Sequence, residues 1–248
     1  MKGRVVVVTG GGSGIGRVLA AGFAKAGATA LVADRDLSSA RQTAAELTDY
    51  GLLAVPCEVD VTNDEHCEQL VARAVELGGP HVLVNNAGGW SAGPDQFPVA
   101  DPDVWSATID LNLRAPMLLA QLCRPAMSAC GGVVVMLASS AGLGSERYGS
   151  PEYAATKAGL VRFTTAMGGD ASTGGQRFVC VVPDWVGLPR AHAERAALPA
   201  AQQAALPPLI PPEDLLNVVL ALVADDSASG TVITLVGGEP PQPLQGSE

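Results

Sequence analysis

The sequence predicts a doubly wound α/β fold, in which helices cover both faces of one seven-stranded parallel sheet. Short β-branched runs alternate with helical stretches along all 248 residues. The runs are almost continuously apolar, as in strands that are buried on both faces. Parallel neighbours also need long crossover connections, which the intervening helices would supply. The expected strands cover residues 4–9, 28–33, 52–58, 81–85, 132–138, 177–182 and 231–236.

Apolar residues spaced three or four apart predict a helix after each of the first six strands. These helices cover residues 14–26, 37–49, 64–77, 101–128, 152–172 and 212–224. The Ala- and Pro-rich stretch 187–212 predicts an irregular, partly helical excursion over the site, and the tail 239–248 is expected to be poorly ordered. We expect a single domain over residues 1–248.

The composition excludes several classes of protein. There are 25 acidic and 15 basic residues, and a net charge of −10 disfavours nucleic acid and anionic membranes as partners. No apolar stretch is long enough for a membrane span, and the N-terminus does not resemble a signal peptide, which predicts a cytoplasmic protein. Five cysteines without a CxxC pair indicate reduced thiols. Cys57, His66 and Cys67 lack a fourth ligand, so no metal site is expected.

The stretch VVVVTGGGSGIGR predicts a binding loop for the pyrophosphate of a dinucleotide. Gly10, Gly14 and Gly16 follow a strand and open a helix, and Ser13 and Ile15 lie between them. Glycines permit a tight turn and a close approach of the backbone to phosphate, and the helix N-terminus contributes free N–H groups. The strand and the helix on either side give the context that a Rossmann-like fold requires.

Two residues at the end of the second strand concern the choice of cofactor. Asp34 follows Gly16 by 18 residues and would hydrogen-bond the ribose hydroxyls of NAD while repelling the 2′-phosphate of NADP. Arg35 is adjacent, and its guanidinium could instead receive that phosphate. The carboxylate favours NAD over NADP.

Three motifs together resemble the classical short-chain dehydrogenase/reductase family: Thr9-Gly10-x-x-x-Gly14-x-Gly16, NNAG at 85–88, and Tyr153-x-x-x-Lys157. The resemblance covers nearly the whole chain. It implies that Asp60 and Val61 border the adenine of the cofactor. It further implies that the cofactor cleft is lined by Asn86, Ala87, Gly88, Tyr153, Lys157, Pro183 and Val186.

The same resemblance implies that Asn112, Ser140, Tyr153 and Lys157 are catalytic. Ser140 is chosen over Ser139 because it precedes Tyr153 by 13 residues. A phenol with a pKa of about 10 is a poor base at neutral pH, and a nearby ammonium would lower that pKa. Residues four apart share a helix face, so Lys157 can lie near Tyr153. Asn112 would support a water that relays protons to Lys157.

The segment VPDWVGLPR departs from the family pattern. Asp184 stands in place of a glycine, and Leu188 stands in place of a threonine that would contact the cofactor. Asp184 either lines the substrate pocket or caps a turn and faces water. In the first case the pocket would also contain Trp90, Ser91, Leu143, Trp185 and His192.

The motifs predict an NAD(P)-dependent oxidoreductase that interconverts a secondary alcohol and a ketone of a small molecule by hydride transfer. The alternative is a non-catalytic nucleotide-binding sensor or scaffold on the same fold. A dehalogenase-like lyase is disfavoured by the glycine turn and Lys157. We also expect a homo-oligomer, either a tetramer or a dimer. The pair Gly168–Gly169 would permit close approach at a subunit interface or mark a frayed helix end.

Overall fold

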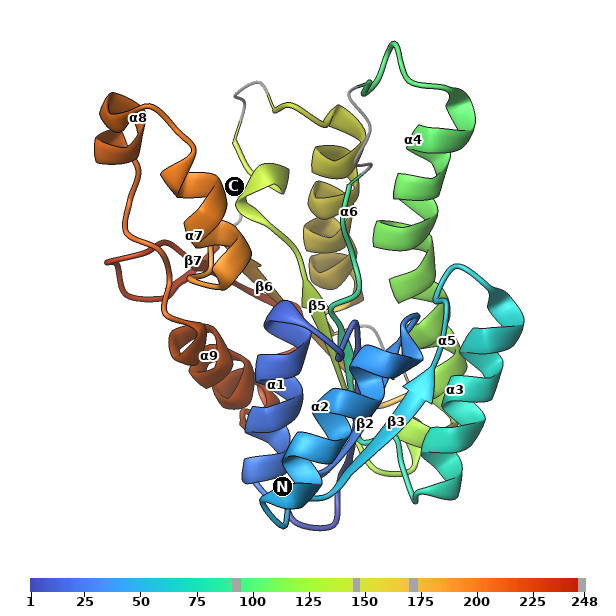
Figure 1. The fold of residues 1–248 in the computed structure, drawn as a ribbon. Helices are drawn as coiled ribbons and strands as arrows, with labels where there is room; N and C mark the ends of the chain where they lie inside the picture. Colours follow the sequence, from blue (N-terminus) through green and yellow to red (C-terminus); the bar gives the residue numbers. More distant parts are fainter. Residues whose placement is uncertain (91–94, 145–147, 170–173, 245–248) are drawn as a thin grey trace.

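The computed structural model describes residues 1–90, 95–144, 148–169 and 174–244, and this part of the chain forms one eight-stranded sheet (Figure 1). The strand order is β3-β2-β1-β4-β5-β6-β7-β8. All seven expected strands form, and they pair in parallel. The strands are β1 Val5–Thr9, β2 Thr29–Asp34, β3 Ala54–Glu58, β4 Val82–Asn85, β5 Val133–Leu137, β6 Arg177–Pro183, β7 Thr231–Leu235 and β8 Gln242–Pro243.

The eighth strand was not predicted, and it makes the expectation of a disordered tail wrong for residues 239–244. After a turn at Gly238, whose φ is +82°, β8 pairs antiparallel with β7. The N–H of Leu244 donates to the carbonyl of Val232 at 2.8 Å. Pro243 is compatible with this position because β8 is an edge strand. Residues 245–248 lie outside the described part of the chain.

Helices cover both faces of the sheet, which confirms the doubly wound fold class (Figure 1). Val6 and Val8 point toward α1, α2 and α9, whereas Val7 points toward α3, α5 and α6. None of the described helices combines the length and apolar character that a membrane crossing requires. The helices are α1 Gly14–Lys25, α2 Leu37–Asp49, α3 Asp64–Glu76, α4 Pro102–Ile109, α5 Ala115–Ser128, α6 Pro151–Met167, α7 Pro189–Ala196, α8 Ala200–Ala205 and α9 Pro212–Ala224.

The helical stretch expected over 101–128 is interrupted by a π-helical turn, η1, at Asp110–Arg114. Such turns often occur at functional sites, because the extra residue redirects the side chains around it. Here the turn contains Asn112, whose side chain is completely buried. Apolar periodicity does not predict the turn, since α4 and α5 continue on either side of it.

Helix α6 ends earlier than expected, at Met167, with Gly168 as its C-cap. Gly169 follows with a φ of +75°, which favours glycine. A Cβ atom on Gly168 would lie 2.6 Å from the Cα of Gly230. The first glycine therefore permits a close approach within the chain, between the end of α6 and the start of β7.

The excursion at 187–212 is partly helical, as expected, and contains α7 and α8 (Figure 1). Its two ends are joined, because the N–H of Gly187 donates to the carbonyl of Ile210 at 2.8 Å. The guanidinium of Arg195 donates to the carbonyls of Gln203, Leu206 and Pro207. These bonds tie α7 to the segment that contains α8.

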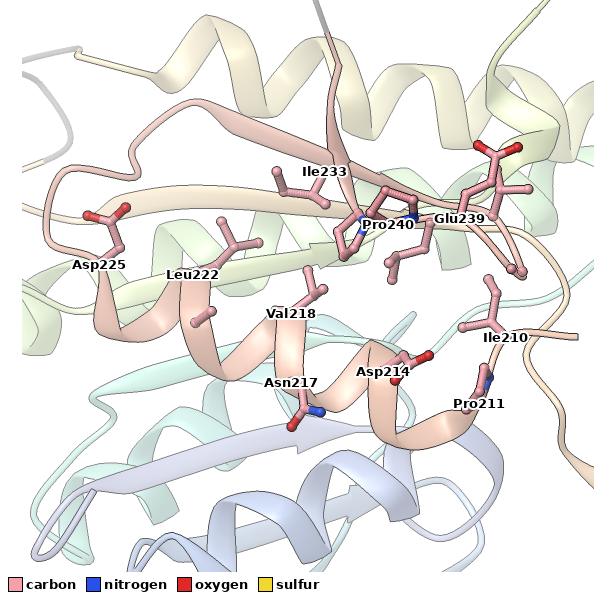
Figure 2. A pocket seen from close by; sticks show the side chains of 16 residues that line it. Ile210, Pro211, Asp214, Asn217, Val218, Leu222, Asp225, Ile233, Glu239 and Pro240 are labelled. Atoms are coloured by element: carbon pink, nitrogen blue, oxygen red, sulfur yellow. The ribbon is translucent and has the colours of Figure 1, made fainter.

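A groove of about 680 Å³ runs between α9, β7 and the turn that follows β7 (Figure 2). Val218 and Leu222 from α9 face Ile233 across it. The carboxylates of Asp214 and Asp225 lie at the two ends of the same helix. The groove shares no lining residue with the cleft that is lined by Tyr153 and Lys157.

The contact between Gly168 and Gly230 predicts that Gly168→Ala destabilises the protein. The added methyl group meets backbone that cannot rotate away, so the free energy of unfolding should fall by roughly 1–3 kcal/mol. Chemical denaturation monitored by circular dichroism measures this change. Gly149→Ala is the matched control, since a Cβ at Gly149 has no atom within 4 Å. Equal stabilities for the two variants would contradict the close approach.

Candidate active site

The candidate site is a cleft at the carboxyl ends of β1 and β4, where the strand order reverses. Ligands bind at this point in open α/β sheets. The cleft has a volume of about 570 Å³. The predicted residues that line it are Gly10, Ser13, Gly14, Ile15, Asn86, Ala87, Gly88, Tyr153, Lys157 and Pro183. It is also lined by Leu137, Ala138, Leu188, Pro189 and Arg190.

The glycine turn fits a dinucleotide pyrophosphate. Gly10 and Gly14 have φ values of +64° and +53°, and a Cβ on Gly16 would overlap the carbonyl of Gly10. Ser13, the N-cap of α1, makes no side-chain capping bond. The first N–H groups of α1 are therefore available to an anion, and the helix dipole favours one there.

Asn86 fastens this turn to β4. Its Nδ2 donates to the carbonyl of Thr9 at 2.8 Å. The hydroxyl of Thr9 accepts the N–H groups of Asn86 and Ala87 and donates to the carbonyl of Val84. The ends of two neighbouring strands are thus held at a fixed separation, with the cleft between them.

Asp34 lies at the end of β2 and supports the turn as well. Its Oδ2 accepts the N–H of Gly12 at 2.9 Å, and its Oδ1 accepts the N–H of Asp36 at 3.1 Å. Each carboxylate oxygen has a second lone pair, so capacity for ribose hydroxyls remains. The neighbouring Arg35 is exposed.

Several predicted residues lie outside the lining of the cleft. The carboxylate of Asp60 accepts the side-chain and backbone donors of Thr62, which lower the pKa of Asp60. Val61 and Val186 are buried, and Val186 forms a β-bridge with Ile210. The predicted site residues that do not line the cleft are Gly16, Asp34, Arg35, Asp60, Val61, Asn112, Ser140 and Val186.

Lys157 is a buried amine at the floor of the cleft. Its Nζ donates to the carbonyl of Leu137 at 2.8 Å and lies 5.5 Å from the centre of the Tyr153 ring. The two residues therefore share a helix face, as their spacing predicts. Burial lowers the pKa of Lys157 to about 8, and Cys180 acts weakly in the opposite direction.

The environment of Tyr153 differs from the expectation. Burial raises the pKa of its phenol, whereas a side-chain hydrogen bond with Ser139 and the charge of Arg190 lower it. The pKa of Tyr153 is thus raised in this structure, whereas the sequence predicted that Lys157 would lower it. The amine lies over the ring, and desolvation dominates.

The two adjacent serines have different partners. Ser140 donates its hydroxyl hydrogen to Oδ1 of Asp184 at 3.1 Å, while Ser139 interacts with the Tyr153 hydroxyl. Ser140 was selected by counting 13 residues back from Tyr153, but this count crosses a loop whose length secondary structure does not set. Counting from the end of β5 is a better guide to which serine lies at the site. By that count Ser139 comes first, two residues beyond the end of the strand.

Asn112 fixes the loop after β4. Its Oδ1 accepts the N–H of Gly89 at 3.0 Å, and its Nδ2 donates to the carbonyls of Gly89 and Thr108 at 2.6 and 2.8 Å. Both amide hydrogens are thus engaged within the protein, so the expected water would have to donate to an oxygen of Asn112. A Cβ on Gly88 would lie 2.8 Å from Oδ1 of Asn112 and 3.2 Å from Nζ of Lys157.

Aromatic rings surround Tyr153. Trp90 meets it edge-on at 5.3 Å, and Tyr148 stacks on it at 6.1 Å. The guanidinium of Arg190 lies over the Trp90 ring at 4.6 Å. Of the other residues expected in the substrate pocket, Leu143 is half-buried and His192 is exposed on α7. Trp185 is partly exposed beside Asp184. Ser91 lies outside the described residues.

The cysteines and histidines show no sign of a metal centre. Within the described ranges, no group of three or more His, Cys, Asp or Glu side chains could hold a metal ion. His66 accepts the N–H of Asp60, and the thiol of Cys67 contacts the carbonyl of Val61. All five cysteines are free thiols.

Comparison with known proteins agrees with this geometry. A family model described as short chain dehydrogenase matches residues 4–198. The chain belongs to the short-chain dehydrogenase/reductase family. Similar relatives include the 7alpha-hydroxysteroid dehydrogenase of Escherichia coli strain K12, 28% identical over 96% of this chain and 94% of the relative. The D-xylose 1-dehydrogenase of Caulobacter vibrioides is 35% identical over 92% of this chain and 91% of its own.

A solved structure shows the same likeness. The 7 alpha-hydroxysteroid dehydrogenase complexed with NADH and 7-oxo glycochenodeoxycholic acid superposes with a TM-score of 0.86. It is 29% identical, and the match covers 96% of this chain and 94% of that one. The resemblance seen in the motifs is therefore confirmed. The chain is a dehydrogenase with oxidoreductase chemistry on a small molecule, and NAD(P) is the cofactor typical of its family.

The crowded surroundings of Gly88 and the open surroundings of Gly89 predict different effects on NADH binding when each is replaced by alanine. In Gly88→Ala the new methyl group displaces Asn112 or Lys157, and NADH affinity should fall about tenfold or more, which corresponds to roughly 1.4 kcal/mol. Gly89→Ala is the control, since its Cβ meets no atom within 4 Å. Fluorescence titration with NADH measures both, after thermal melts confirm folding. Equal affinities for the two variants would contradict the described packing.

The buried amine predicts a pH-dependent stability. Between about pH 8 and 10.5 the unfolded chain keeps the proton on Lys157, whereas the folded protein has lost it, so stability should rise with pH. Below pH 8 both states are protonated, and this contribution is constant. Relative to Lys157→Met, the wild type should gain roughly 2–3 kcal/mol between pH 7 and pH 10 in urea unfolding. A difference between the two proteins that does not change with pH would refute the buried position.

Proposed function

We propose that the protein interconverts a secondary alcohol and a ketone of a small molecule by hydride transfer with NAD. The observation that carries the proposal is the buried amine of Lys157 beneath Tyr153, in the cleft that begins at the glycine turn. A bound nicotinamide would supply the hydride acceptor or donor. The residues of the chain would hold the substrate and move the proton.

Tyr153 is the proposed general acid and base. Because its pKa is raised, the resting phenol is protonated and can donate a hydrogen bond to the substrate oxygen. Lys157, with a pKa of about 8, titrates near neutral pH and could pass a proton to or from the cleft. Ser139 is favoured over Ser140 as the second group on the substrate oxygen, since the hydroxyl hydrogen of Ser140 is directed at Asp184. Asn112 acts as a positioning residue for Gly88 and Gly89.

The preference for NAD over NADP is supported by the carboxylate of Asp34. It accepts the N–H of Gly12, which fixes a negative charge beside the turn, where a 2′-phosphate would be repelled. Arg35 is exposed and makes no ion pair among the described residues.

The alternative function, a nucleotide-binding sensor or scaffold, is favoured by one observation. Leu188 replaces a cofactor-binding threonine, and its Cδ1 would lie 4.0 Å from a Cβ on Gly14. An apolar side chain thus borders the phosphate loop, where it offers no hydrogen bond. The two named relatives act on a hydroxysteroid and on a sugar, so likeness to them does not indicate one substrate.

A homo-oligomer, either a tetramer or a dimer, also remains a proposal. It is supported by the groove between α9 and β7, whose walls include the half-buried apolar side chains of Val218 and Ile233, since an uncovered apolar groove often marks an interface. Light scattering on the purified protein measures the mass. The single-domain organisation and the cytoplasmic location remain predictions.

Catalysis is tested with Tyr153→Phe, measured by NADH absorbance over a panel of secondary alcohols and ketones. Loss of the proton-transferring hydroxyl should lower kcat by about 10²–10⁴-fold while NADH still binds. Ser139→Ala should lower kcat more than its matched control Ser140→Ala, and NADPH should support a lower kcat/KM than NADH. A wild-type protein that binds NADH but turns over no alcohol or ketone would favour the sensor instead.

A further inference from the structure

Asp184 and Ser140 form a polar pair beside the catalytic residues. The backbone N–H of Asp184 donates to the carbonyl of Leu235 at 2.9 Å, which fixes this residue between the ends of β6 and β7. Its Oδ1 accepts the hydroxyl of Ser140, a residue 44 positions away. The side chain therefore joins two strand ends across the site. It does not cap a local turn, so the second sequence-based interpretation of Asp184 is wrong.

This pair can only accept hydrogen bonds. A serine hydroxyl has one hydrogen, and that of Ser140 is directed at Asp184. What remains for a ligand is the lone pairs on Ser140 and on the carboxylate. None of the ion pairs within the described ranges includes Asp184. Arg195 lines the same small cavity as Asp184, but its guanidinium donates to backbone carbonyls instead. A half-buried carboxylate without an ion pair favours a ligand that donates a hydrogen bond.

Asp184 is near the aromatic ring that stacks on Tyr153, although it lines a separate small cavity beside the cleft. Tyr148 stacks on Tyr153, and Asp184 is close enough to act on it electrostatically. The pKa of Tyr148 is raised mainly by burial, and the negative charges of Glu194 and Asp184 raise it further. Glu194 is paired with Arg190 at 2.7 Å, whereas Asp184 has no such partner in the described part of the chain.

We propose that Asp184 is a specificity-determining residue that binds a hydrogen-bond donor on the carbon next to the reacting one. The donor is a hydroxyl or an ammonium group, so the substrate class is a vicinal diol, an amino alcohol or the corresponding ketone. The inference rests on the proposed function. It deepens that function because the glycine expected from the family at position 184 would offer no such acceptor.

The test compares matched substrates with and without the donor. The probes are cyclohexanol, trans-1,2-cyclohexanediol and trans-2-aminocyclohexanol, together with 2-butanol and 2,3-butanediol, each with NAD. We expect kcat/KM of the wild type to favour a donor-bearing member by about tenfold or more. Asp184→Ala should abolish this preference, because kcat/KM of the donor-bearing members falls toward that of the simple alcohols. Asp49→Ala, which removes an exposed carboxylate at the end of α2, should keep it.

Asp184→Asn separates the two donors. Its amide oxygen still accepts from a hydroxyl, so a preference for the diols should largely survive, whereas a preference for the ammonium group should be lost. Turnover without a donor preference would overturn the inference alone. So would an equal loss on all probes in Asp184→Ala, since that result makes Asp184 only a support for Ser140. No turnover of any alcohol or ketone by a protein that binds NADH would overturn the proposed function as well.

Discussion

The site depends on burying one amine without a carboxylate partner. Lys157 is 4% exposed, and its partner is the backbone carbonyl of Leu137. Burial of a charge is costly unless it is paired, and here the cost appears as a pKa of about 8. A lysine at this value exchanges protons near neutral pH, which an exposed lysine does not. Burial of Lys157 in the packed interior therefore determines the pH range in which this amine can exchange a proton.

Glycines, which have no side chain, permit the close packing around this amine and in the glycine turn. Gly88 leaves room for both Nζ of Lys157 and Oδ1 of Asn112, and Gly16 lies against the carbonyl of Gly10. Asn86 holds the glycine turn to β4, while Asn112 holds the loop that follows β4. The candidate cleft and the residues proposed for proton transfer are thus parts of one hydrogen-bonded framework at the point where the strand order reverses.

Local patterns predicted most of the fold, and long-range contacts account for what they missed. The seven parallel strands follow from apolar runs, and the glycine turn follows from spacing within one strand–helix unit. The strand β8 depends on pairing after a turn, and η1 leaves the apolar periodicity of its neighbours unchanged. The partners of Ser139 and Ser140 depend on how the loop after β5 meets β6. Asp184 could be placed at a strand end, but its bond to Ser140 required the folded structure.

The sequence predicted that Tyr153 and Lys157 lie close together, but it did not predict that the pKa of Tyr153 is raised. Four-residue spacing places both on one face, and the structure confirms this. The sequence could not show that burial outweighs the attraction of the cation for a phenolate. In the proposed reaction Tyr153 would therefore start as a protonated phenol, which can donate a hydrogen bond to the substrate oxygen.

The most direct measurement is a titration of the lysine side chains by ¹³Cε NMR, which is simple here because the chain has only Lys2, Lys25 and Lys157. We expect one resonance to titrate near pH 8 and to be missing from the spectrum of Lys157→Met. Three lysines that all titrate near their usual pKa of about 10.4 would show that this amine is solvated. The link between burial and proton exchange would then be lost.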